Sequence, residues 1–173
     1  PIETLKADID EMARLKLNAF HWHLTDYPAW RIQCKKYPIL NDPSKRIKGR
    51  DVNDTYTYDQ IRDLFRYARK RHIQIIPEID MPGHSTYFKN CFGFPMHDPR
   101  GIKILEELLE EFCREIPVEM SPYLHIGADE IHIPNGKQFA DRMAAKVKSL
   151  GRQPIQWAGN NDLPVSGDSY AQL

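Results

Sequence analysis

Short apolar segments that end in acidic residues recur along this chain, with amphipathic segments between them. The clearest predicted strands cover 19–24, 72–80 and 123–128, and acidic residues stand at or just after their ends: Asp26, Asp80, Asp129 and Glu130. Weaker strand patterns follow at 154–157, which ends in Trp157, and at 169–173. Strands that alternate with helices of about 10 to 15 residues are typical of βα units on a parallel sheet. We therefore predict an α/β fold with a parallel sheet.

Amphipathic helices are predicted between the strands. They cover 4–15, 59–71, 101–116 and 136–150. We expect Asp59 to cap the second helix, and we expect an acidic run on the third helix to face solvent. That run is Glu106, Glu107, Glu110 and Glu111. The interval 31–57 lacks periodicity, which is more typical of a functional surface loop than of a spacer.

Composition narrows the class of protein further. The 173 residues suffice for one domain with a sizeable core. The 24 basic and 24 acidic residues give a net charge of 0, which removes the usual electrostatic argument for binding nucleic acid or an anionic membrane. No apolar stretch approaches the roughly 20 residues that span a bilayer. The chain begins with Pro1 and shows no basic, then apolar, leader pattern, so we expect a processed, truncated or engineered N-terminus.

The cysteines give no framework for disulfides or zinc. Cys34, Cys91 and Cys113 are few and scattered, and no CxxC pair is present. We expect three free, partly buried thiols, which leaves the cellular compartment open.

The carboxyl ends of parallel strands meet at one edge of a sheet, which is where such folds bind ligands. A single aspartate at a strand end is usually a cap or a turn residue. Four acids together with His84 and Trp157 at one edge are harder to assign to capping. Clustered carboxylates move each other's pKa values apart, so that one stays protonated beside an ionised neighbour. An acid of that kind beside an aromatic wall suits the cleavage of a glycosidic bond.

Three segments resemble signatures of glycoside hydrolase family 20, the β-N-acetylhexosaminidases. Residues 20–26 and 29–31 resemble the family's HWHLTD segment and the GWR that follows it. Residues 76–85, IPEIDMPGHS, are similar to its PEIDMPGHS segment, and residues 125–130, HIGADE, are similar to its HIGGDE segment. The three segments stand in the family's order, and the resemblance runs from about Asp8 to Trp157. The resemblance implies a (β/α)8 TIM barrel.

The resemblance also implies an activity. Members of the family are retaining exo-hydrolases that release terminal N-acetylglucosamine or N-acetylgalactosamine, and the acetamido oxygen of the substrate is the nucleophile. Glu130 would be the general acid and base, and Asp129 would orient the acetamido group. Substrate assistance removes the need for a second carboxyl group across the sugar, which explains why the two acids are adjacent. The implied partner is a glycan or glycoconjugate ending in N-acetylhexosamine, without a cofactor or a metal.

The resemblance assigns the other site residues as well. Asp26 and His84 would form a supporting pair that positions and tunes the general acid. Trp157 would wall the acetamido pocket, and Asp80 would contact the substrate or else organise the loop that follows it. The resemblance favours a periplasmic, secreted or lysosomal enzyme without fixing the compartment.

Two features depart from the family pattern. Ala128 stands where the family has a glycine, and we expect the strand end to accept its methyl group if its φ is negative. Taken as a single domain over 1–173, the chain matches about strands two to six of a barrel of about 250 residues. We therefore expect an incomplete barrel with little or no activity by itself, and with open sheet edges available for strand pairing or oligomer formation.

Two alternatives remain open at this stage. In a metal-dependent hydrolase on the same architecture, His21 and His23 share one strand face, and His84, His125 and the acids complete a metal site. Histidines that are simply packed in a barrel explain the same pattern. The second alternative is a non-catalytic piece of a hexosaminidase, with or without weak sugar binding.

Overall fold

The computed structural model describes residues 1–47 and 54–173. Part of the predicted loop 31–57, including Gly49, lies outside the described residues. The helices are α1 (Ile2–Arg14), α2 (Tyr58–Arg69), α3 (Thr86–Phe92), α4 (Pro99–Glu115) and α5 (Gly136–Ser149), with 3-10 turns η1 (Pro38–Asn41) and η2 (Pro43–Lys45). The strands are β1 (Ala19–His23), β2 (Thr25–Asp26), β3 (Ala29–Trp30), β4 (Gln74–Glu78), β5 (Tyr123–His125), β6 (Gln153–Trp157) and β7 (Tyr170–Gln172).

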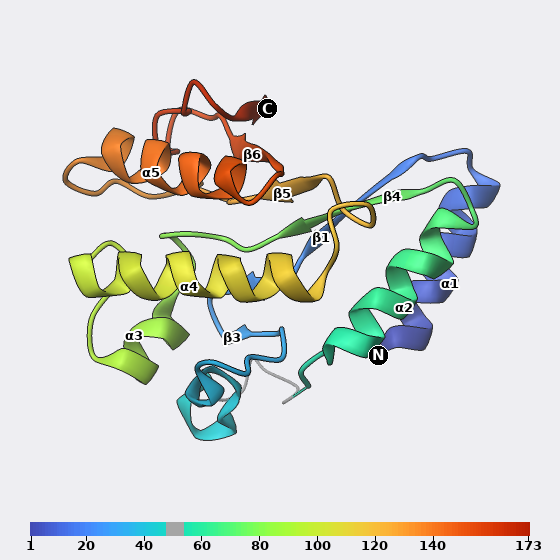
Figure 1. Ribbon diagram of the computed structural model, residues 1–173, viewed down its shortest axis with the longest axis horizontal. Coiled ribbons are helices and arrows are strands. Elements are labelled where there is room, and N and C mark those ends of the chain that lie inside the picture. Colours follow the sequence, from blue (N-terminus) through green and yellow to red (C-terminus); the bar gives the residue numbers. More distant parts are fainter. Residues whose placement is uncertain (48–53) are drawn as a thin grey trace.

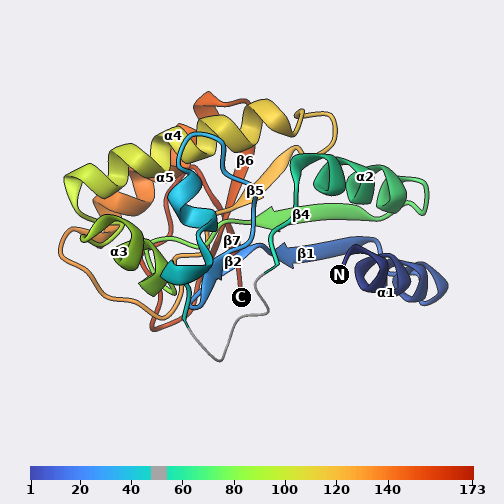
Figure 2. The same ribbon diagram turned by 90° about the horizontal axis from the view of Figure 1, so that it is seen from below.

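The predicted parallel α/β sheet is confirmed. Its strand order is β1-β4-β5-β6-β7, and every neighbouring pair is parallel. In Figure 2 the arrows of β1 and β4 point the same way, with α2, α4 and α5 on one side of the sheet. Asp26 is not at the tip of a sheet strand as expected, because β2 and β3 form a small antiparallel hairpin beyond β1. The hairpin carries Asp26 over the carboxyl-terminal edge.

Local sequence explains where two helices begin. Thr57 caps α2, because its hydroxyl accepts the Gln60 N–H while the Gln60 side chain accepts the Thr57 N–H. Asp59 lies in the first turn of α2, so its predicted role as the cap is wrong. The seven-residue helix α3 was not predicted, and it buries Tyr87 and Phe88 beside the loop that follows β4.

One member of the predicted solvent-facing acidic run is buried. Glu111 of α4 is 2% exposed. It accepts hydrogen bonds from the N–H groups of Lys35 and Lys36 and from the Tyr58 hydroxyl. A buried carboxylate needs such donors, and here they come from the loop after β3 and from α2. Glu111 therefore fastens this loop to the helical layer.

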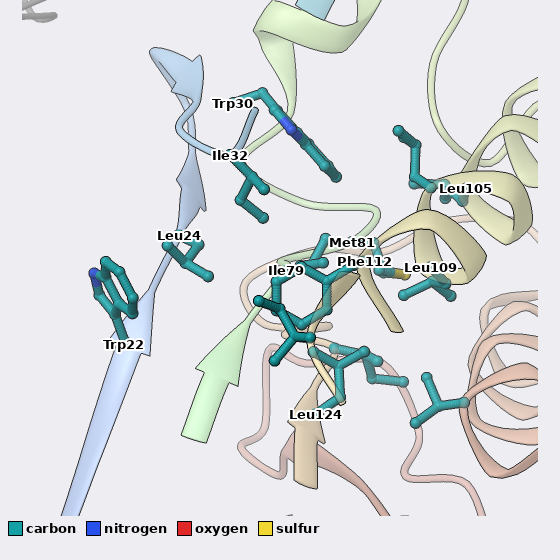
Figure 3. Close-up of a cluster of buried hydrophobic side chains, with 14 of the residues drawn as sticks. Trp22, Leu24, Trp30, Ile32, Ile79, Met81, Leu105, Leu109, Phe112 and Leu124 are labelled. Carbon is teal, nitrogen blue, oxygen red and sulfur yellow. The ribbon is translucent and has the colours of Figure 1, made fainter. Parts of the chain in front are cut away.

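The main apolar core lies between the sheet and its helices (Figure 1, Figure 3). Trp22 and Leu24 approach it from β1 and its extension, and Leu105, Leu109 and Phe112 approach it from α4. All five side chains are at most 5% exposed. Burying a side chain of this size contributes roughly 1.5–3 kcal/mol. The core therefore fixes the helix-facing side of the sheet and leaves the opposite side for other chemistry.

β1 and β7 are the outer strands of the sheet among the residues that the structure describes. The Tyr170 side chain on β7 is 58% exposed. The sheet therefore has the open form of part of a barrel. Within the described ranges, no helix has the length and apolar character needed to cross a membrane. The cysteines are free thiols, as predicted.

Candidate active site

The face of the sheet opposite the helices carries imidazoles, a carboxylate and an indole. The register pairs His23 with Glu78, and Glu78 with His125. Paired residues of neighbouring strands point to the same face. Trp157 shares that face, because it lies two residues beyond Ile155, which pairs with His125. The strand register therefore gathers these side chains below the carboxyl-terminal edge.

A cavity of about 940 Å³ opens at that edge. Its lining residues are His23, Leu24, Asp26, Tyr27, Pro28, Arg31, His84, Asp129 and Trp157. They come from β1, the β2–β3 hairpin, the loops after β4 and β5, and the end of β6. The volume falls within the usual range of small-molecule pockets. Four of the predicted site residues therefore line one cavity: Asp26, His84, Asp129 and Trp157.

His84 links the acidic groups of the pocket. Its Nε2 atom lies 3.2 Å from Glu130 Oε2, and its Nδ1 atom lies 3.1 Å from Asp80 Oδ2. Asp26, the partner expected from the sequence, is farther away, with its Oδ1 atom 3.8 Å from His84 Nδ1. The contact with Asp80 outweighs burial and raises the pKa of His84 to about 9. At neutral pH, His84 therefore carries a proton on both ring nitrogens and presents one to Glu130.

The two adjacent acids occupy different environments. The Asp129 side chain is 19% exposed, and its Oδ1 atom is buried without a hydrogen-bond partner among the described residues. Burial and the charge of Asp80 raise the pKa of Asp129 to about 6. The Glu130 side chain, in contrast, is 70% exposed. Asp129 thus offers a buried oxygen that can accept a hydrogen bond, whereas Glu130 is accessible for proton transfer, and such unlike environments suit acid–base catalysis.

The backbone that carries these acids is left-handed at three positions. The φ values are +66° at Gly127, +76° at Ala128 and +49° at Glu130, so the condition under which Ala128 was expected to fit, a negative φ, is not met. A side chain in this region costs roughly 1–2 kcal/mol. Asp80 Oδ1 accepts the Ala128 N–H, and Asp162 Oδ1 accepts the Glu130 N–H, which hold the turn. A Cβ atom at Gly127 would overlap Asp80, so this close approach requires glycine.

Two groups of side chains bring possible metal ligands within 4.8 Å of one another. They are His21, Glu78 and His125, and Asp80, His84 and Asp129. In the first group Glu78 accepts the indole N–H of Trp157 and His125 Nδ1 accepts the Gly127 N–H, whereas the Nε2 atoms of both imidazoles have no hydrogen-bond partner among the described residues. The second group lies in the pocket and holds its imidazole between acids. That the site works without a metal stays a prediction.

Sequence reasoning did not single out Glu78 as a site residue. Its side chain is 1% exposed. Its Oε1 atom accepts the Trp157 indole N–H at 3.1 Å, and its Oε2 atom lies 2.8 Å from His23 Nδ1. Burial alone would raise the pKa of Glu78, but the neighbouring imidazoles outweigh burial and hold this pKa well below its usual range. The sequence does contain a signal for Glu78: it is an acidic residue within a β-branched strand, and the neighbouring strand has a His-x-His pattern that can supply hydrogen-bond partners.

Acids of unlike environment, a charged imidazole and an indole at the carboxyl-terminal edge of a parallel sheet are the features of a barrel-type glycoside hydrolase. Comparison with known families makes the class specific. The model of glycosyl hydrolase family 20, catalytic domain, matches residues 1–92. The chain belongs to glycosyl hydrolase family 20.

Individual relatives agree with this assignment. A β-hexosaminidase of Porphyromonas gingivalis is 39% identical over 75% of this chain and 19% of its own length. A β-hexosaminidase of Vibrio furnissii is 33% identical over 91% of this chain and 34% of its own. The chain therefore spans about a fifth to a third of these two relatives.

Solved structures reproduce the whole fold. The β-N-acetylhexosaminidase of Bacteroides fragilis superposes with a TM-score of 0.83 at 29% identity, over 100% of this chain and 41% of that one. The exo-β-N-acetylglucosaminidase of Vibrio harveyi, in complex with N-acetylglucosamine, superposes with a TM-score of 0.80 at 26% identity, over 100% and 36% of the two chains. The sheet described above is therefore part of a TIM barrel in these relatives.

Proposed function

We propose that the protein is a β-N-acetylhexosaminidase, which removes terminal N-acetylglucosamine or N-acetylgalactosamine from glycans or glycoconjugates. Family membership supports this activity, and so do relatives that are named for it. The observation that carries the proposal is the Asp129–Glu130 pair: Asp129 lines the cavity with a partly buried carboxyl group, and Glu130 presents an exposed one beside His84. The residues fit a substrate-assisted reaction with retention of configuration.

Glu130 is the proposed general acid and base. Its carboxyl group is exposed, which leaves it open to a glycosidic oxygen, and His84 Nε2 lies 3.2 Å from its Oε2 atom. Glu130 protonates the leaving group in the first step and takes a proton from water in the second step. The charged imidazole of His84 restrains the orientation of the Glu130 carboxyl group.

Asp129 is the proposed partner of the substrate acetamido group. Its buried Oδ1 atom is an acceptor without a donor in the described part of the chain, and the acetamido N–H of the substrate can supply that donor. When Asp129 is ionised, its charge orients the acetamido oxygen toward the anomeric carbon and offsets the positive charge of the oxazolinium-like intermediate. A second carboxylate nucleophile across the sugar is then unnecessary.

The remaining residues have supporting roles in this proposal. Trp157 forms an apolar wall of the cavity, which suits the acetamido methyl group or a sugar face. Asp80 charges His84 and holds the Ala128 N–H, so it positions the site from below. Asp26 lines the cavity beside His84 and is available to a sugar hydroxyl.

Because the 173 residues by themselves are expected to have little or no activity, the test is hydrolysis of a chromogenic N-acetylglucosaminide by the longest chain that carries them and by the same chain with Glu130→Gln. We expect the variant to lose about 10²- to 10⁴-fold in kcat, because the proton donor is removed. NMR of the first-formed sugar should show the β-anomer. The matching glucoside, which lacks the acetamido group, should not be cleaved. Absence of turnover by the protein, with N-acetylglucosamine still bound, would support a sugar-binding remnant instead.

A further inference from the structure

The carboxylate of Glu78 joins two walls of the pocket that come from opposite parts of the sheet. Its Oε1 atom accepts the indole N–H of Trp157 on β6, at 3.1 Å. Its Oε2 atom accepts the Nδ1–H of His23 on β1, at 2.8 Å. In the sheet order, β4 and β5 stand between these two strands. No backbone ladder connects β1 to β6, so this side-chain bridge links them directly.

Both partners of Glu78 face the pocket. His23 and Trp157 line the same cavity as Asp129 and His84. Glu78 itself lies beneath the cavity, with its side chain 1% exposed. Water therefore cannot replace it as a hydrogen-bond acceptor without opening the site. His23 and Trp157 therefore line the cavity, and the Glu78 carboxylate beneath it holds both side chains by hydrogen bonds.

The surroundings of Glu78 leave it ionised and fully engaged. His21 Nε2 lies 2.7 Å from Glu78 Oε2, and the amide nitrogen of Gln172 lies 3.3 Å from His21 Nδ1. The Gln172 amide nitrogen donates to His21 Nδ1, so the proton of His21 is on Nε2, which is within ion-pair distance of the carboxylate but makes no hydrogen bond to it. The rings of His21 and Trp157 also pack together, with centroids 5.5 Å apart. Donors thus surround Glu78 from β1 and β6, and they restrain its two oxygens.

The hydrogen bond to Glu78 also determines the tautomer and orientation of the His23 imidazole. Hydrogen bonding to Glu78 requires the proton on Nδ1, which leaves Nε2 on the pocket side, 4.0 Å from Asp26 Oδ1. Burial lowers the pKa of His23, but the hydrogen bond and the charge of Glu78 outweigh burial and raise it. The orientation of this imidazole therefore depends on one buried carboxylate.

We propose that Glu78 is the positioning residue of the sugar pocket, which sets the separation and orientation of its His23 and Trp157 walls. The inference rests on the proposed function for the identity of the sugar, N-acetylhexosamine. It predicts that Glu78 acts on binding through its two partners, without touching the substrate. Loss of the bridge frees the indole to rotate and lets His23 change tautomer, so bound sugar is held less tightly.

The test compares Glu78→Gln with the protein and with Glu3→Gln, a matched control at an exposed position on α1. One readout is the indole N–H resonance of Trp157, assigned by its loss in Trp157→Phe. We expect Glu78→Gln to move this resonance upfield, because a carboxylate acceptor is replaced by a neutral amide. The imidazole titration of His23 should move to lower pH in the same variant. Glu3→Gln should change neither signal.

A second readout uses N-acetylglucosamine itself. We expect Glu78→Gln to weaken its binding on the order of 10-fold, and to raise KM more than it lowers kcat. If the protein binds no N-acetylglucosamine, the proposed function fails, while the two NMR signals still decide the positioning role. An unmoved indole resonance together with an unmoved His23 titration overturns the inference, even if activity is lost.

A folding defect in Glu78→Gln would not end the test. Trp157→Phe keeps the apolar wall and removes only the donor to Glu78 Oε1. The carboxylate then has fewer competing donors, so the His23 titration should move to higher pH. An unchanged His23 titration in Trp157→Phe would contradict a shared carboxylate, because the two walls would then be independent.

Discussion

Asp80 controls the charge of the proposed active site, and Asp80→Asn tests this directly. Its Oδ2 atom lies 3.1 Å from His84 Nδ1, and its Oδ1 atom accepts the Ala128 N–H. Asparagine keeps a side-chain oxygen for the backbone contact and removes the charge. Asp80 raises the pKa of His84, and it also raises the pKa of Asp129. Neutralising Asp80 should therefore lower both pKa values.

The magnitude follows from the pKa of His84. It rises from its ordinary 6.5 to about 9, and each pKa unit corresponds to about 1.4 kcal/mol. Because the His84 side chain is 31% exposed, solvent screening leaves roughly 2 kcal/mol for its interactions with the acids. Asp80 is the largest contributor, so its loss should lower the pKa of His84 by about one to two. Burial contributes most at Asp129, whose pKa should fall by less than one.

The assay is the pH dependence of kcat/KM with a chromogenic N-acetylglucosaminide. In the proposed mechanism Asp129 acts ionised and His84 acts protonated, so we expect a bell-shaped profile with limbs near their pKa values of about 6 and about 9. In Asp80→Asn both limbs should move to lower pH, and the alkaline limb should move more. Asp8→Asn, an exposed change on α1, is the matched control. An alkaline limb that stays in place in Asp80→Asn would refute the reasoning.

Four further outcomes follow from the structure. The pKa of Asp129 is raised to about 6, so its contribution to the free energy of unfolding falls as pH rises from about 4 through 6. Asp129→Asn should therefore stabilise the fold by about 1–2 kcal/mol at pH 7 but not at pH 3.5, measured by urea unfolding. Ala128→Gly should stabilise by about 0.5–1 kcal/mol in the same assay, because φ is +76° at this residue. Glu111→Ala should cost about 2–4 kcal/mol by leaving buried donors unpaired, while the exposed Glu110→Ala changes stability by less than about 0.5 kcal/mol. Dialysis against EDTA should leave the hydrolytic rate unchanged, and stoichiometric zinc that restores a lost rate would contradict a metal-free site.

Pattern alone predicted the architecture because the strands are short, β-branched and separated by amphipathic helices. Strands β1, β4, β5 and β6 were placed to within a few residues, and their carboxyl-terminal ends do gather His84, Asp129 and Trp157 at one cavity. Residue spacing carries this information, because parallel strands must end at one edge. Asp26 reaches the same cavity on the β2–β3 hairpin. The two strands of this hairpin have only two residues each, which is too short for a recognisable sequence pattern.

The sequence predictions that failed share one cause: the features they concern depend on contacts with residues distant in the sequence. Glu111 looked like one of four solvated acids, yet it lies between Leu108 and Phe112 at the border of the buried stripe of α4, where loop amides reach it. Glu78 looked like part of a strand, and its role appears only when the register places imidazoles on both sides. The positive φ of Ala128 is imposed by Asp80 and by the surrounding loops, so no local propensity could reveal it.

The hydrogen bonds that build the pocket join residues far apart along the chain. Their sequence separations are 46 residues for His84 with Glu130, 55 for His23 with Glu78, 79 for Trp157 with Glu78, and 151 for Gln172 with His21. Each contact requires closure of a long loop, whose entropy must be lost before the contact forms. Such high contact order is associated with slow folding. No single segment can preform the pocket, so the capacity to bind sugar should appear during refolding only when the whole sheet is assembled.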